Sequence, residues 1–82
     1  MSRVSELAET SMQREAGDGA AMFDLKVSYI SAQDGAQELR AVSRVVHAGR
    51  RTIVTECRIE TTDGRLVAAA SGTFSVSREQ EN

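Results

Sequence analysis

The chain has 82 residues, of which 40% are apolar and only 4% are aromatic, and it contains no proline. This length allows one small domain. Ten basic and twelve acidic residues give a net charge of −2, which argues against a nucleic-acid partner because such proteins normally carry a basic excess. No apolar run reaches the ~18 residues of a membrane-spanning helix, and the N-terminus lacks the apolar core of a secretory signal. We therefore expect a cytoplasmic protein with no membrane partner.

The cysteine and histidine counts bear on metal binding and on disulfides. Cys57 is the one cysteine and His47 the one histidine. A single cysteine cannot close an internal disulfide, and this pair alone cannot make a zinc site. We therefore expect no metal site.

Residues 3–15 are predicted to form a helix. Apolar or small side chains recur with a period of 3.6 and make one stripe, which consists of Val4, Leu7, Ala8, Ser11 and Met12. Ser2 is a suitable N-cap because its hydroxyl can accept from an amide one turn on. Gly17 and Gly19 end the helix.

After the helix the period changes to two, which predicts strands. The predicted strands are residues 22–30, 38–48, 51–61 and 66–76. The alternation in the first strand places four side chains on one half-buried face, namely Phe23, Leu25, Val27 and Tyr29. Asp34-Gly35 and Asp63-Gly64 are turn sequences, and the second predicts a tight hairpin. Residues 77–82 are predicted to be a polar tail.

One apolar helical stripe and one apolar sheet face must cover each other, which predicts an α+β domain. The last strand carries Ala68, Ala70 and Gly72 on one face. Such small side chains allow a helix to approach the sheet closely.

Four segments, in order and at the usual spacing, resemble hot-dog fold thioesterases of the phenylacetate-degradation and 4-hydroxybenzoyl-CoA type. The segments are LAETSM (7–12), DLKVSYI (24–30), RVVHAGRR (44–51) and IETTDGRLVAAASGTFSV (59–76). The resemblance covers most of residues 5–76 and implies a central helix wrapped by an antiparallel sheet. The family's first strand, and its His-Gly-Gly motif at the start of the helix, have no counterpart here. The resemblance therefore implies that residues 1–82 are a single partial hot-dog domain, truncated at its N-terminus.

The resemblance also implies an activity, namely hydrolysis of an acyl-CoA or aroyl-CoA thioester to a free acid and CoA. No cofactor is implied, since coenzyme A is part of the substrate. The match at LAETSM places Glu9 at the position of the catalytic carboxylate. By helical position alone, Glu9 is more commonly a solvated residue at the margin of the apolar stripe. Gln13, one turn later, stands where the family often has Ser or Thr, and we expect it among the substrate-binding residues.

Arg50 and Arg51 follow a turn at Gly49, and their guanidinium groups suit bidentate binding of the CoA phosphates. The alternative is a solvated hairpin end. His47 has no orienting partner evident in the sequence, and a lone strand histidine is more often structural. The strand alternation makes Cys57 a small core residue rather than a nucleophile.

The sequence leaves alternatives open for the oligomeric state and for the function. The resemblance implies a homodimer that pairs through strand 22–30, with active sites that use both subunits, or a tetramer of such dimers. The main alternative to a thioesterase is a catalytically incomplete hot-dog module that binds acyl ligands or only assembles. The missing His-Gly-Gly segment favours this alternative. A hot-dog dehydratase is disfavoured because no histidine stands at the matching place.

Overall fold

The computed structural model describes residues 3–31 and 38–76, which form one helix followed by four strands. The elements are α1 (Arg3–Ala16), β1 (Ala20–Tyr29), β2 (Leu39–Ala48), β3 (Thr52–Thr61) and β4 (Leu66–Val76). The predicted elements are confirmed in type and order. The proposed cap at Ser2, the Asp34-Gly35 turn and the polar tail 77–82 lie outside the described residues.

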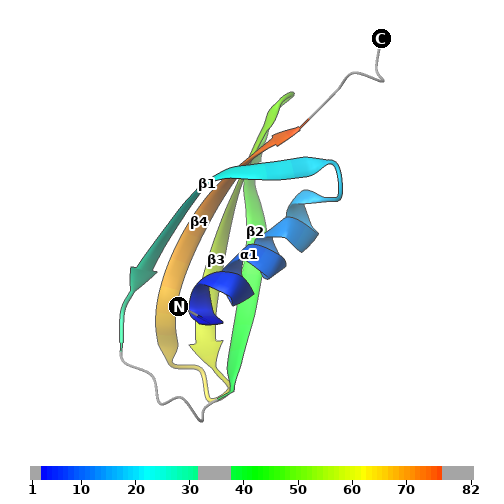
Figure 1. Cartoon of the computed structure of the whole chain (residues 1–82). Helices are drawn as coiled ribbons and strands as arrows, with labels where there is room; N and C mark the ends of the chain where they lie inside the picture. The colour runs from blue at the N-terminus through cyan, green and yellow to red at the C-terminus, as the bar shows by residue number, and fades with distance from the viewer. Residues whose placement is uncertain (1–2, 32–37, 77–82) are drawn as a thin grey trace.

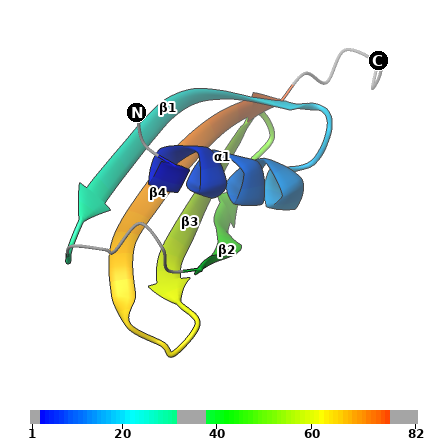
Figure 2. The same cartoon turned by 60° about the horizontal axis from the view of Figure 1, so that its bottom comes forward.

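The four strands make one antiparallel sheet in the order β1-β4-β3-β2. Consecutive strands β2, β3 and β4 form a meander, and β1 returns to pair with β4. The sheet curves around α1, which lies across its concave face (Figure 1, Figure 2). Among the described strands, β1 and β2 are the two edges.

The core lies between α1 and the concave face of the sheet. The helix contributes Val4, Ala8 and Met12 to it. Gly72 on β4 lies at this contact, and a Cβ there would lie 3.0 Å from Met22 Cε and 3.3 Å from Met12 Cε, so both methionine side chains would have to shift. The prediction that small side chains on the last strand admit the helix is therefore confirmed.

The alternation predicted for the first strand is wrong at Phe23. The register of β1 against β4 shifts immediately after Met22, which makes Phe23 the extra residue of a β-bulge. Met22 therefore packs against the core, whereas Phe23 is 64% exposed. Beyond the bulge, Leu25 and Val27 return to the core side and are partly buried, as predicted. Tyr29, at the strand end, is 57% exposed rather than half-buried.

The predicted Asp63-Gly64 hairpin connects β3 to β4. Gly64 adopts a φ of 96°, and its N–H donates to the carbonyl oxygen of Thr61 at 3.0 Å. A residue with a side chain rarely adopts this backbone conformation, which explains the glycine. The hydroxyl of Thr61 donates to the carboxylate of Asp63, and this hydrogen bond holds the pKa of Asp63 below its usual value.

Candidate functional site

Glu9 lies near the middle of α1, and its side chain is exposed. One flank of the helix faces β2, where a 2.7 Å hydrogen bond joins the hydroxyls of Ser11 and Ser43. The other flank carries Glu9 and Gln13, which are four residues apart and therefore neighbours on the helix surface. Gln13 contacts Ala20, the first residue of β1. Glu9 therefore lies on the side of α1 nearer the edge strand β1.

Glu9 and Gln13 line one shallow depression of about 370 Å³. The rest of its lining is Thr10, Arg14 and Asp18, from α1 and the turn that follows it. None of these three residues is distinguished by the sequence pattern. Exposed polar residues at such spacings occur on most surface helices, so the pattern alone does not mark a site.

The side chain of Gln13 is bound to the backbone that follows the helix. Its Nε2 donates to the carbonyl oxygens of Gly17 at 3.0 Å and Ala20 at 2.9 Å. Gly17 has a φ of 100°, and its N–H donates to the carbonyl oxygen of Gln13 at 2.9 Å, which closes the helix. Gln13 therefore joins the end of α1 to the start of β1. Nothing in the sequence pattern indicated this contact.

Arg50 and Arg51 are exposed on the turn between β2 and β3. The N–H of Gly49 donates to the carbonyl oxygen of Thr52 at 2.8 Å and closes the turn. The N–H of Val76 donates to the carbonyl oxygen of Arg51 at 3.0 Å and ties the turn to the end of β4. The turn that carries the two arginines is therefore bonded to the start of β3 and to the end of β4.

The two basic residues that precede this turn have different surroundings. The Nε2 atom of His47 lies 3.4 Å from the place that a Cβ on Gly49 would take, so the imidazole lies beside the turn. The guanidinium of Arg44 instead donates to Glu56 at 3.1 Å. The depression beside Glu9 takes none of its lining from this turn. The depression that Glu9 lines therefore includes neither Arg50 nor Arg51.

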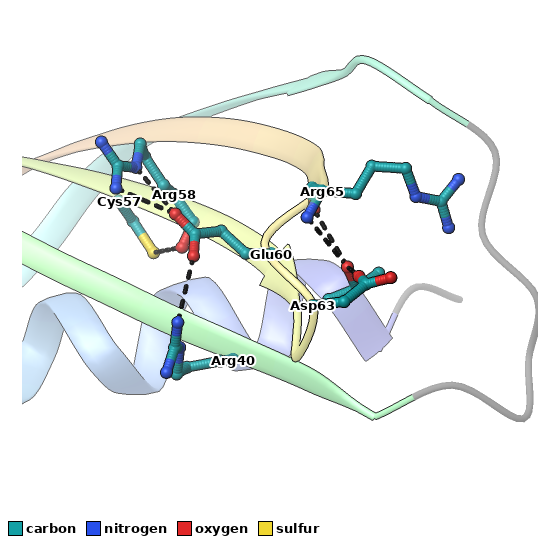
Figure 3. Close-up of polar contacts among 7 residues, drawn as sticks. Arg40, Cys57, Arg58, Glu60, Asp63 and Arg65 are labelled. Atoms are coloured by element: carbon teal, nitrogen blue, oxygen red, sulfur yellow. Dashed lines mark hydrogen bonds and ion pairs between the residues drawn. The ribbon is translucent and has the colours of Figure 1, made fainter.

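The sheet face opposite α1 carries paired charges. Glu60, whose side chain is only 12% exposed, accepts from Arg58 at 2.9 Å and from Arg40 at 3.4 Å (Figure 3). Arg40 and Arg44 stand directly opposite Glu60 and Glu56 in the β2–β3 register, which suits cross-strand ion pairs. These side chains therefore support the pairing of β2 with β3, and we assign them no catalytic role.

Cys57 is 2% exposed and belongs to the core, which confirms its prediction as a buried residue. Over residues 3–31 and 38–76, His, Cys, Asp and Glu side chains form no group of three or more suited to a metal ion. Within the same ranges, the helix is neither long nor apolar enough to cross a membrane.

The family of the chain follows from its sequence. The profile of the Thioesterase superfamily matches residues 3–68. The chain belongs to the Thioesterase superfamily. No curated protein shows a significant match to it.

Solved structures agree with this membership of the Thioesterase superfamily. The BH2602 protein of Bacillus halodurans, solved with CoA, is 32% identical with a TM-score of 0.74, over 89% of this chain and 55% of that one. A hypothetical thioesterase from Streptococcus pneumoniae, solved with coenzyme A, is 28% identical with a TM-score of 0.67, over 71% of this chain and 45% of that one. The chain thus spans about half the length of these relatives.

A third structure bears on the fold alone. A mutant of the phenylacetic acid degradation protein PaaI from Thermus thermophilus is 20% identical with a TM-score of 0.79, over 88% of this chain and 64% of that one. The hot-dog architecture that the four segments implied, one helix against a four-stranded antiparallel sheet, is confirmed. The narrower phenylacetate-degradation or 4-hydroxybenzoyl-CoA type remains a prediction.

Proposed function

We propose that the chain is part of a thioesterase that hydrolyses an acyl-CoA or aroyl-CoA to a free acid and CoA, with Glu9 as the catalytic carboxylate. The observation that carries the proposal is an exposed carboxylate on the α1 flank nearer the edge strand β1, in a member of the Thioesterase superfamily. CoA in two of the similar solved structures supports a CoA thioester as the substrate.

Glu9 can act by either of two routes. As a general base it takes a proton from a water molecule that attacks the thioester carbonyl carbon. As a nucleophile it attacks that carbon itself, and water then opens the resulting anhydride. Both routes break the carbon–sulfur bond, and the CoA sulfur leaves as the thiol after it takes up a proton.

Arg50 and Arg51 are proposed to bind the CoA phosphates. Their exposure on a turn with a fixed backbone supports this role, because a guanidinium can reach two phosphate oxygens at once. A homodimer that pairs through β1, the strand predicted at 22–30, is part of the same proposal. In such a dimer, the carboxylate of one subunit and the arginines of the other can serve one substrate.

The test compares the wild type with Glu9→Gln in a thiol-release assay on a panel of acyl-CoA and aroyl-CoA substrates. Loss of the carboxylate should lower kcat by roughly 10²–10⁴-fold, the usual contribution of a general base. Glu6→Gln is the matched control, because Glu6 is also exposed on α1 but does not line the depression. Its kcat should equal that of the wild type.

Two outcomes would contradict the proposal. Equal rates for the wild type and Glu9→Gln would remove Glu9 from the mechanism. Binding of acyl-CoA without turnover by the wild type would favour the alternative, a hot-dog module that binds acyl ligands or only assembles.

A further inference from the structure

The side chain of Gln13 joins two elements beside the proposed catalytic carboxylate. We propose that Gln13 is a positioning residue, which holds Glu9 at a fixed place relative to the edge strand β1, and that it does not donate a hydrogen bond to the substrate. The inference rests on the proposed function of Glu9. It revises the expectation that Gln13 belongs among the substrate-binding residues.

Both amide hydrogens of Gln13 are already bonded to backbone carbonyl oxygens. Its partners are the carbonyl oxygens of Gly17 and Ala20, which can only accept, so the amide nitrogen and not the oxygen must face them. The two bonds use both hydrogens of the NH₂ group. Only the amide oxygen of Gln13 is left, and an acceptor cannot stabilise a thioester carbonyl or an oxyanion.

These bonds close the junction between the end of α1 and the start of β1. The carbonyl oxygen of Gly17 also accepts from the N–H of Ala20 at 3.3 Å, and the N–H of Gly17 donates to the carbonyl oxygen of Gln13 at 2.9 Å. Ala20 is buried and pairs with Val76 of β4, so it is anchored in the sheet. Through Gln13, the end of α1 is therefore attached directly to the sheet.

The position of the Glu9 carboxylate depends on this junction between α1 and β1. Glu9 lies one turn before Gln13 on the same flank of α1. In the described part of the chain, no hydrogen bond or ion pair holds the Glu9 carboxylate. Its place therefore depends on how α1 sits against the sheet, and the hydrogen bonds of Gln13, one turn later on the same flank, attach α1 to the start of β1.

This arrangement predicts a particular kinetic effect. If the attachment is lost, α1 can shift relative to β1, and a displacement of ~1 Å in a catalytic group can cost about 10²-fold in rate. Arg50 and Arg51 are carried by the turn between β2 and β3, which accepts none of the hydrogen bonds donated by Gln13. The expected effect is a lower kcat with an unchanged KM.

Two substitutions separate a positioning role from substrate contact. Gln13→Met keeps the length of the side chain but has no donor, and it should lower kcat by roughly 10–10²-fold with KM unchanged. Gln13→Lys has three donors and no amide oxygen, so its ammonium group can reach both carbonyl oxygens. Gln13→Lys should therefore keep the attachment between α1 and β1. Because a lysine four residues after Glu9 can also pair with that carboxylate, this variant is assessed by hydrogen exchange and not by kcat. Thermal unfolding of both variants checks that each is folded.

A second readout needs no turnover. Hydrogen exchange of the Gly17 and Ala20 amides should become faster in Gln13→Met and stay slow in Gln13→Lys. Equal exchange in the wild type and both variants overturns the proposal, as does a wild-type kcat in Gln13→Met. If Glu9 is not the catalytic carboxylate, the result is different. The kcat of Glu9→Gln then equals that of the wild type, whichever residue occupies position 13.

Discussion

Arg50 and Arg51 differ from the other arginines whose contacts define the sheet. Arg40, Arg44 and Arg58 donate to carboxylates on neighbouring positions of β3. Arg50 and Arg51 differ in position, since they lie on a turn whose backbone is held by bonds to β3 and β4. A fixed backbone with long cationic side chains is suited to a flexible phosphate group, and this is the basis of the proposed CoA contact.

The double substitution Arg50→Ala and Arg51→Ala should raise the KM for acyl-CoA about tenfold or more and leave kcat unchanged, since one hydrogen bond to a charged group contributes about 1.5–3 kcal/mol. Steady-state kinetics on acyl-CoA and on the matching acyl-pantetheine measure the effect. Acyl-pantetheine lacks the nucleotide phosphates, so its KM should not change. An equal rise in KM for both substrates would contradict phosphate binding. Arg58→Gln is the control for removal of an exposed arginine.

At the scale of elements, Met12 of α1 packs against β4 at Gly72. Gly72 lies opposite Thr55 of β3 and Leu25 of β1, so it sits in the centre of the sheet. Its carbonyl oxygen accepts from the buried hydroxyl of Thr55 at 3.2 Å, which satisfies a polar group in the core. The methyl groups of Met22 on β1 and Met12 on α1 lie 3.0 Å and 3.3 Å from the place that a Cβ at Gly72 would take, so a side chain there would displace them.

Gly72→Val should destabilise the fold by about 1–3 kcal/mol, because added atoms in a packed core force side chains and backbone to move. Urea denaturation gives the free energy of unfolding. Ser75→Val on the same strand is the control, since Ser75 is exposed and a β-branched residue suits a strand there. A Gly72→Val variant as stable as the wild type would show that α1 does not rest on β4 as described.

At the scale of the whole molecule, the two edges of the sheet carry the large exposed apolar side chains. Phe23, Tyr29 and Ile30 are 64%, 57% and 53% exposed along or just after β1. The other edge, β2, exposes Val42, Val45 and Val46. Exposed apolar edge strands favour association, and the proposed dimer uses β1 because Glu9 lies on that side.

Phe23→Lys should shift the chain from dimer to monomer, because a charge on the β1 edge opposes strand pairing. Size-exclusion chromatography with light scattering at micromolar concentration measures the mass. Val46→Lys is the matched control, since Val46 is 47% exposed on the opposite edge, and it should remain dimeric. A monomeric wild type, or a Val46→Lys variant that alone becomes monomeric, would contradict pairing through β1.

The sequence by itself determined the elements, because the signals for them are local. The 3.6-residue stripe of α1, the alternation around Cys57 on β3 and the Asp63-Gly64 turn each depend on a few neighbouring residues. The family resemblance added the central helix wrapped by an antiparallel sheet and the choice of Glu9 as the candidate carboxylate.

Only the tertiary structure decided which side chains meet. Phe23 faces outward because the register against β4 contains a bulge, and strand alternation alone does not reveal a bulge. Gln13 uses its donors on Gly17 and Ala20 because the chain reverses between α1 and β1. Glu9 lies near β1 because α1 crosses the sheet in one particular orientation. These features depend on contacts between separate elements, and such contacts leave no periodic pattern within any one of them.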